Sequence, residues 1–138
     1  MERLIGLDTS VLIYLLEDHP LLADPAERIF RRIRDGGWWG VFSHIGMVEL
    51  LTGVKKRERP DLVNRYRELL LSIQHLYLRG TTLPIVEIAS NLRATYNIKT
   101  ADAIHIATSI ASGADLFVTH DKRLTAIREI PVVMLDQL

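Results

Sequence analysis

A chain of 138 residues that is 48% hydrophobic and 25% charged has the composition of one folded domain with a sizeable core. Its 17 basic and 17 acidic residues balance, which excludes a globally basic nucleic-acid-binding protein and leaves only local clusters of charge. The chain has no cysteine, which excludes disulfides, thiolate zinc sites and cysteine nucleophiles.

Short apolar runs alternate with helical patterns along the first half of the chain. Asp24 and Pro25 have the pattern of a helix start, with Asp24 as the cap and Pro25 at the first helical position. Ser43 is expected to cap another helix after the second apolar run. In chain order we predict a strand over 3–7, a helix over 11–17, a helix over 24–36, a strand over 38–42 and a helix over 43–53.

The second half of the chain continues this alternation. Pro60 opens a helix, and a strand over 76–79, a helix over 84–96, a helix over 100–112, a strand over 115–119, a short helix over 122–127 and a strand over 131–135 are expected after it. Strands separated by helices indicate a parallel sheet covered on both faces. We therefore predict a single α/β domain over residues 1–138, a three-layer α/β/α sandwich around a short parallel sheet.

The helix predicted from residue 100 carries a carboxylate near its start. Thr100 is placed to cap the helix, and Asp102 then lies in the first turn. An acid at this position interacts with the positive end of the helix dipole and stabilises the helix by roughly 0.3–1 kcal/mol. Asp102 alone therefore does not indicate a function.

Four carboxylates are nevertheless predicted to meet at one edge of the sheet. Asp8 directly follows the first strand, and Asp121 follows the strand over 115–119. Glu49 lies in the helix after the second strand, and Asp102 opens a helix that leads to a strand. Ligand sites in open parallel sheets form outside the carboxyl ends of the strands. Capping could explain Asp8 or Asp121 singly, but not acids on four segments that converge at one edge.

Such a group of acids favours a hard cation. Close carboxylates repel one another and bind protons unless a cation neutralises them. Oxygen ligands without cysteine or paired histidines favour Mg²⁺ or Mn²⁺ over zinc, and one or two such ions can activate a water toward a phosphodiester. Thr9, Ser10 and Thr119 are candidate auxiliary hydroxyls at the same edge, with helix capping as the simpler role of Ser10.

Four segments carry a family resemblance, namely LDTSVLIYLL at 7–16, SHIGMVELLTG at 43–53, LRATYNIKTADAIHIATSIASGADLFVTHDKRL at 92–124 and IPVVML at 130–135. Together they resemble the PIN-domain family, and within it the small ribonuclease toxins of VapC type. The resemblance implies that Asp8, Glu49, Asp102 and Asp121 are catalytic ligands of Mg²⁺ or Mn²⁺. It also implies a PIN-like fold, an RNA substrate, a role as toxin in a type II toxin–antitoxin system, a small antitoxin partner and a homodimer.

Two residues depart from the pattern of many relatives. Gly46 stands three residues before Glu49, where a threonine or serine is common, and His120 stands where an asparagine often precedes the last aspartate. Neither change removes a carboxylate, so we expect altered geometry or substrate preference rather than inactivity. His105 fits the family's DAxH pattern and is interpreted as a structural residue with a local hydrogen-bond partner.

Two other classes of protein remain as alternatives. A non-catalytic module derived from the PIN domain could bind RNA or a protein, although it would not need all four acids. A phosphatase or receiver domain also has an aspartate after its first strand. Phosphatases with the dehalogenase-like pattern require a second aspartate two residues after the first, where this chain has Ser10. A receiver domain requires adjacent acids just after its first strand, where this chain has only Asp8.

Two groups of cations are candidates for RNA binding, comprising Lys55, Lys56, Arg57 and Arg59, and Lys122 with Arg123. Trp38 and Trp39 belong either to the core or to an interface. No apolar run approaches the roughly 18 residues of a membrane span, and Asp8 interrupts the N-terminal apolar stretch too early for a signal peptide. A cytoplasmic protein without membrane contact is therefore expected.

Overall fold

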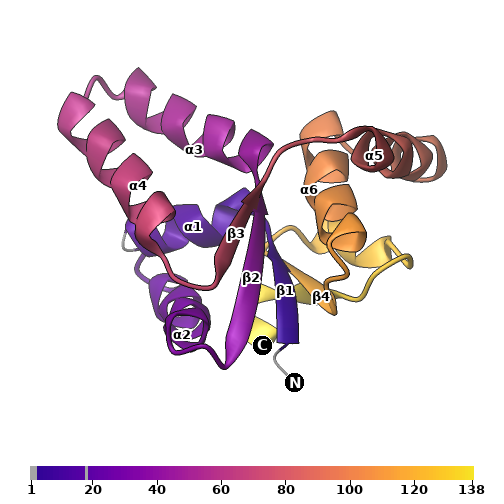
Figure 1. Ribbon diagram of the computed structural model, residues 1–138, viewed down its shortest axis with the longest axis horizontal. Coiled ribbons are helices and arrows are strands. Elements are labelled where there is room, and N and C mark those ends of the chain that lie inside the picture. The colour runs from indigo at the N-terminus through magenta and orange to yellow at the C-terminus, as the bar shows by residue number, and fades with distance from the viewer. Residues whose placement is uncertain (1–2, 18) are drawn as a thin grey trace.

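Five parallel strands form the centre of the computed structural model, which describes residues 3–17 and 19–138 (Figure 1). The strands are β1 (Arg3–Leu7), β2 (Trp38–Ser43), β3 (Leu76–Arg79), β4 (Leu116–Thr119) and β5 (Val132–Met134). The helices are α1 (Thr9–Leu16), α2 (Ala23–Arg34), α3 (His44–Lys56), α4 (Pro60–Ser72), α5 (Leu83–Thr95) and α6 (Thr100–Ala111), with the short 3₁₀ turns η1 (Lys122–Ala126) and η2 (Leu135–Gln137). This arrangement confirms the predicted α/β fold.

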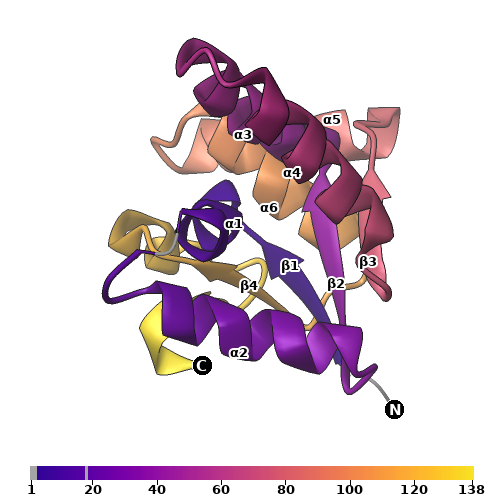
Figure 2. The same cartoon turned by 90° about the vertical axis from the view of Figure 1, so that its left-hand side faces the viewer.

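Helices cover both faces of the sheet. In Figure 1, α1 to α4 lie on one side and α5 and α6 on the other, and Figure 2 looks onto the side that carries α1 and α2. Each side has its own apolar core: Phe30 and Phe42 belong to the first core, and Ile106 and Phe117 to the second. The inner strands β1, β2 and β4 are apolar and buried along most of their length, as is typical of parallel sheets that are covered on both faces.

The strand order is β3-β2-β1-β4-β5. The chain leaves β1 to form β2 and β3 on one side, and later returns to form β4 and β5 on the other. The order therefore reverses between β1 and β4, where Leu7 is in register with Val118. The carboxyl ends of these two strands mark the switch point, outside which open α/β sheets bind ligands.

Several predicted boundaries are wrong by one turn or less. α1 begins at Thr9 because Asp8 caps it, whereas the sequence pattern predicted a start at residue 11. α2 begins at Ala23, so that Asp24 lies in its first turn rather than at the cap. α6 begins at Thr100 itself, and neither Lys99 at its cap position nor Thr100 makes a side-chain capping bond, which corrects the expected capping role of Thr100.

Ser43 does cap α3, as predicted, by accepting a hydrogen bond from the Gly46 N–H at 3.1 Å. The helix then continues past Gly53 to Lys56. Val54 is buried in the core, and this burial offsets the roughly 1 kcal/mol cost of a glycine within a helix. Among the helices within residues 3–17 and 19–138, none is long and apolar enough to cross a membrane.

Candidate active site

Asp8 directly follows β1 at the switch point and contacts the end of β4. It ends β1 and is 8% exposed, and its Oδ1 accepts a hydrogen bond from the Thr9 N–H at 2.8 Å, which caps α1. Its Oδ2 accepts a hydrogen bond from the Thr119 hydroxyl at 2.6 Å. Burial raises the pKa of Asp8, against the lowering effect of the Thr119 hydrogen bond. Asp8 therefore serves as a helix cap and also joins the ends of both strands.

Asp121 lies at the end of β4 and is joined to Asp8 through Thr119. The Asp121 N–H donates to the Thr119 hydroxyl oxygen at 3.0 Å, so the same hydroxyl must donate its own hydrogen to Asp8. The carboxylate of Asp121 accepts hydrogen bonds from Arg123, at 3.1 Å from Nε and 2.8 Å from a terminal nitrogen. These bonds hold the pKa of Asp121 below its ordinary value.

Glu49 approaches from α3 and is held by two groups. Its Oε1 accepts a hydrogen bond from the Thr9 hydroxyl at 2.8 Å and lies 2.6 Å from Nε2 of His105. The hydrogen bond to His105 is the largest cause that lowers the pKa of Glu49. The side chain remains 43% exposed, so this carboxylate faces solvent while one of its oxygens is anchored in the protein.

Asp102 projects from the first turn of α6, as predicted, and is partly buried. No hydrogen bond to its carboxylate is found within the described residues. Burial raises its pKa most, and the negative charges of Asp8, Asp121 and Glu49 raise it further. The surroundings of Asp102 therefore disfavour the charged form of its carboxylate.

The four acids lie within electrostatic reach of one another. Across residues 3–17 and 19–138, no three acidic or histidine side chains enclose a position suited to a metal ion. Protein donors occupy both oxygens of Asp8, one oxygen of Glu49, and the carboxylate of Asp121. The donor set is nevertheless made of carboxylates and hydroxyls, which fits Mg²⁺ or Mn²⁺, and a cation would relieve the repulsion that raises the pKa of Asp102.

Comparison with known protein families identifies the family of this chain. The family model of the PIN domain matches residues 5–130. The chain belongs to the PIN domain family. The search of curated proteins finds no match.

Several solved structures share the fold of this PIN domain. VapBC2 from Rickettsia felis, bound to a DNA fragment from its promoter, has a TM-score of 0.78 at 19% identity, over 95% of this chain and 98% of that one. A toxin–antitoxin complex from Klebsiella pneumoniae has a TM-score of 0.74 at 24% identity, over 99% and 100%. The sarcin–ricin-loop-cleaving toxin VapC20 from Mycobacterium tuberculosis has a TM-score of 0.72 at 17% identity, over 92% and 98%.

The auxiliary hydroxyls of the PIN domain are placed differently from one another. Thr9 and Thr119 are buried and bonded to acids of the site. Ser10 does not cap α1, because Asp8 does. Within the described part of the chain the buried hydroxyl of Ser10 has no hydrogen-bond partner.

His120, which stands where many relatives have asparagine, packs edge-on against Tyr14, with ring centroids 5.4 Å apart.

Sequence reasoning missed Lys99, which lies directly before α6. Its positive charge lowers the pKa of both Glu49 and Asp121, so it lies near the acids. Together with Asp102 and Arg123 it lines a hollow of about 50 Å³. The sequence signal that could have identified Lys99 is its position at the N-terminus of a helix. The helix dipole disfavours a cation there, so a lysine at this position is unusual.

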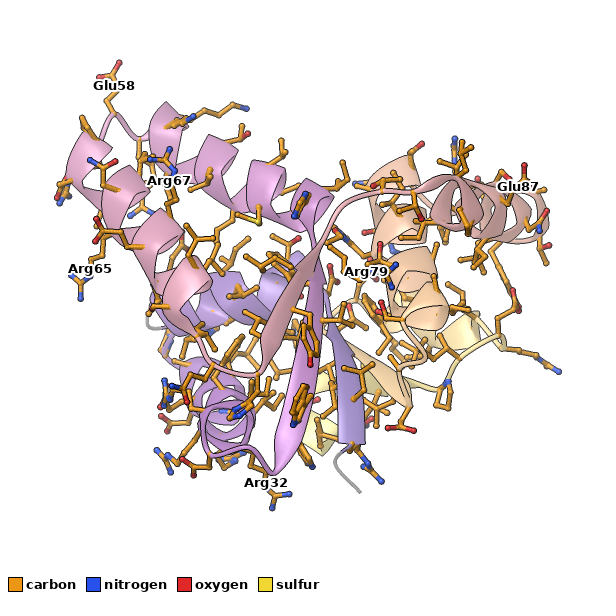
Figure 3. The ribbon with its side chains drawn as sticks, viewed as in Figure 1. Arg32, Glu58, Arg65, Arg67, Arg79 and Glu87 are labelled. Atoms are coloured by element: carbon orange, nitrogen blue, oxygen red, sulfur yellow. The ribbon has the colours of Figure 1, made fainter. Side chains whose placement is uncertain are left out.

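Three of the six predicted RNA-binding cations are engaged in ion pairs. Arg57 pairs with Glu17 at 2.9 Å, Arg59 pairs with Asp61 at 2.9 Å, and Arg123 pairs with Asp121 at 2.8 Å. Lys55, Lys56 and Lys122 form no ion pair within residues 3–17 and 19–138. The first group lies at the tip between α3 and α4, which Glu58 marks in Figure 3.

The packing of α3 explains why residue 46 is glycine. A Cβ at Gly46 would lie 2.3 Å from Cζ of Phe42, whose ring is fully buried. The serine or threonine of many relatives would therefore overlap the Phe42 ring. The unusual glycine is a consequence of the phenylalanine at the end of β2.

We expect Gly46→Ser to lower the free energy of unfolding by about 1–3 kcal/mol, as overpacking of a core does. Urea denaturation would measure the change. Gly53→Ser is the matched control in the same helix, because a Cβ there meets no atom within 4 Å. Equal stability of the two variants would refute this account of Gly46.

Proposed function

We propose that this PIN domain is a metal-dependent endoribonuclease and the toxin of a type II toxin–antitoxin pair of VapC type. The observation that carries the proposal is the convergence of four acids from four elements. Thr9 bonds both Asp8 and Glu49, and Thr119 bonds both Asp8 and Asp121. Burial raises the pKa of Asp102, and the charges of these three acids raise it further. An arrangement that opposes its own ionisation is costly for folding unless a cation binds.

The residues of the site fit such a reaction. Asp8, Glu49, Asp102 and Asp121 would hold one or two Mg²⁺ or Mn²⁺ ions, which supply an activated water and stabilise charge on a phosphodiester. Thr119 orients Asp8 and Thr9 orients Glu49 through the hydrogen bonds described above. Lys99 and Lys122 supply positive charge beside the acids, where the phosphates of RNA would lie.

The partner is inferred from proteins of the same fold. The Rickettsia felis and Klebsiella pneumoniae structures are toxin–antitoxin complexes, and the Mycobacterium tuberculosis toxin cleaves the sarcin–ricin loop. By analogy we propose a small antitoxin partner and an RNA substrate for this chain. The homodimeric assembly is a proposal that rests on the sequence resemblance alone.

Expression in a bacterial host tests the proposal against the non-catalytic alternative. We expect the wild-type chain to arrest growth, because the acidic site is intact, and Asp8→Asn at the same protein level to permit growth. Growth rate and the integrity of total RNA are the measurements. A binding module would make wild type and Asp8→Asn behave alike, with the RNA of the host intact in both.

The lysines at the end of α3 are expected to contact RNA phosphates. Lys55→Gln with Lys56→Gln should weaken RNA binding and reduce the slope of log K against log [salt] by about 1.4, since each contact with single-stranded nucleic acid contributes about 0.7. Titration of a labelled RNA at several salt concentrations would measure the slope.

The matched control removes two arginines from α2, Arg28→Gln with Arg31→Gln. Arg32 of the same helix lies at the opposite end of the domain from α3 in Figure 3, and the control should leave the slope unchanged. Equal slopes for the lysine variant and the wild type would assign Lys55 and Lys56 to ordinary surface.

A further inference from the structure

His105 is buried beneath the acidic site and contacts residues far away in the chain. Its side chain is 1% exposed, Nδ1 lies 2.7 Å from the Ser43 hydroxyl, and Nε2 lies 2.6 Å from Oε1 of Glu49. These partners are 62 and 56 residues away, so the expected local hydrogen-bond partner of the ring is wrong. Each ring nitrogen therefore has a hydrogen-bond partner, Ser43 at Nδ1 and Glu49 at Nε2.

The chemistry of the partners determines where a neutral ring carries its hydrogen. A carboxylate can only accept, so Nε2 must carry the hydrogen and donate it to Glu49. Nδ1 is then an acceptor and requires a donor. The Ser43 hydroxyl oxygen already accepts from the Gly46 N–H, and its own hydrogen is available for Nδ1. The four groups thus form one directed chain of hydrogen bonds.

The orientation of the ring is fixed by packing as well. Phe42 is stacked on His105 with an interplanar angle of 15° and ring centroids 6.5 Å apart. Phe42 also lies against Gly46, and Ser43 is the cap of α3, so the start of this helix and the ring are held together. Rotation of the imidazole would break bonds at both of its nitrogens.

We propose that His105 is a positioning residue, which Ser43 holds in one tautomer so that it orients Glu49 for cation binding. Glu49 needs such support because its side chain is 43% exposed and the Thr9 hydroxyl otherwise holds it only through the same oxygen, Oε1. The bond from His105 fixes Oε1, whereas no hydrogen bond to Oε2 of Glu49 is found within the described residues. This inference rests on the proposed metal-dependent function and identifies what prepares one of its acids.

Mn²⁺ binding provides a test that does not require activity. We expect His105→Leu to raise the Mn²⁺ Kd, measured by electron paramagnetic resonance, by about 10- to 100-fold, the usual effect of removing a group that orients a metal ligand. His105→Gln should restore most of the affinity, because its amide can donate to Glu49. At saturating Mn²⁺ the kcat of His105→Gln should approach the wild-type value.

Ser109→Ala is the matched control, since it removes a buried hydroxyl from the same helix that bonds the His105 backbone carbonyl at 3.1 Å and leaves the ring unchanged. It should bind Mn²⁺ as wild type does. Ser43→Ala keeps the ring but removes the donor to Nδ1, so it should raise the Kd several-fold. Ser43 also caps α3, so if His105→Leu does not fold, Ser43→Ala tests the proposal through its Mn²⁺ Kd together with the nitrogen-15 spectrum of the ring.

Nitrogen-15 NMR of the imidazole provides a second measurement. We expect the spectrum of His105 to show a hydrogen on Nε2 and none on Nδ1, and Ser43→Ala to shift that signature. A hydrogen on Nδ1, or a folded His105→Leu with the wild-type Mn²⁺ Kd, would overturn the inference alone. Failure of the wild type to bind Mn²⁺ would overturn the proposed function and this inference together.

Discussion

Asp8→Asn should reduce the cleavage of RNA in Mg²⁺ or Mn²⁺ by about 100- to 1,000-fold, the usual cost of removing one electrostatic group from an active site. Asparagine can still accept the hydrogen bond from the Thr9 N–H and cap α1. It loses the charge that would retain the cation, and its amide meets a Thr119 hydroxyl that is oriented to donate. The cost in stability should be about 1 kcal/mol, that of one hydrogen bond.

The chain offers a control with the same chemical change at the opposite end of the sheet. Asp115 precedes β4 and accepts a hydrogen bond from the Leu4 N–H at 2.9 Å, so Asp115→Asn also alters a carboxylate that bonds a strand amide. Its cleavage rate should equal that of the wild type. Circular dichroism would verify the folding of both variants. Cleavage by the wild type in chelator at an undiminished rate would exclude the metal mechanism.

Asp102→Asn should melt at a higher temperature than the wild type in chelator at neutral pH. The pKa of Asp102 in the folded chain is raised, so the folded state binds the proton more tightly than the unfolded state does. The penalty for ionisation is absent below the ordinary value of 3.8 and is complete once the pH exceeds the raised pKa. The advantage of the variant should therefore shrink as the pH is lowered toward 4.

Mn²⁺ should reverse the order of the two proteins. At about 100 times its Kd the ion should stabilise the wild type by about 2.7 kcal/mol, which corresponds to roughly 5–10 °C in a domain of this size. Asp102→Asn should gain much less. Thermal melting followed by circular dichroism, with and without Mn²⁺, measures both effects. If the variant melts lower in chelator and neither protein responds to Mn²⁺, Asp102 is only a residue of the helix start.

Local signals in the sequence were sufficient for the fold and for the placement of the acids at one edge. Asp8 and Asp121 follow directly from the ends of apolar runs, because a strand that ends at the carboxyl edge delivers its next residues there. The cap at Ser43 likewise depends on neighbours three residues away. Such features depend on residues that are close together in the sequence.

The contacts of the site could not be predicted in the same way. The hydrogen bond between Thr119 and Asp8 joins residues 111 positions apart, and His105 reaches Ser43 across 62. Periodicity identifies a buried histidine but not its partners, which depend on the order of the strands. The cap of α6 was predicted wrongly because Thr100 is a preferred capping residue whose side chain makes no capping bond here.

The order of the strands also determines when the site comes into existence during synthesis. β1 lies between β2 and β4, so the first strand to leave the ribosome lacks one neighbour until residues 116–119 have been made. A nascent chain that ends before Leu116 carries Asp8 and Glu49 without the strand that pairs with β1 beside Asp8. Pairings between distant segments form late in folding. The proposed metal site therefore forms only after residues 116–121 have been translated.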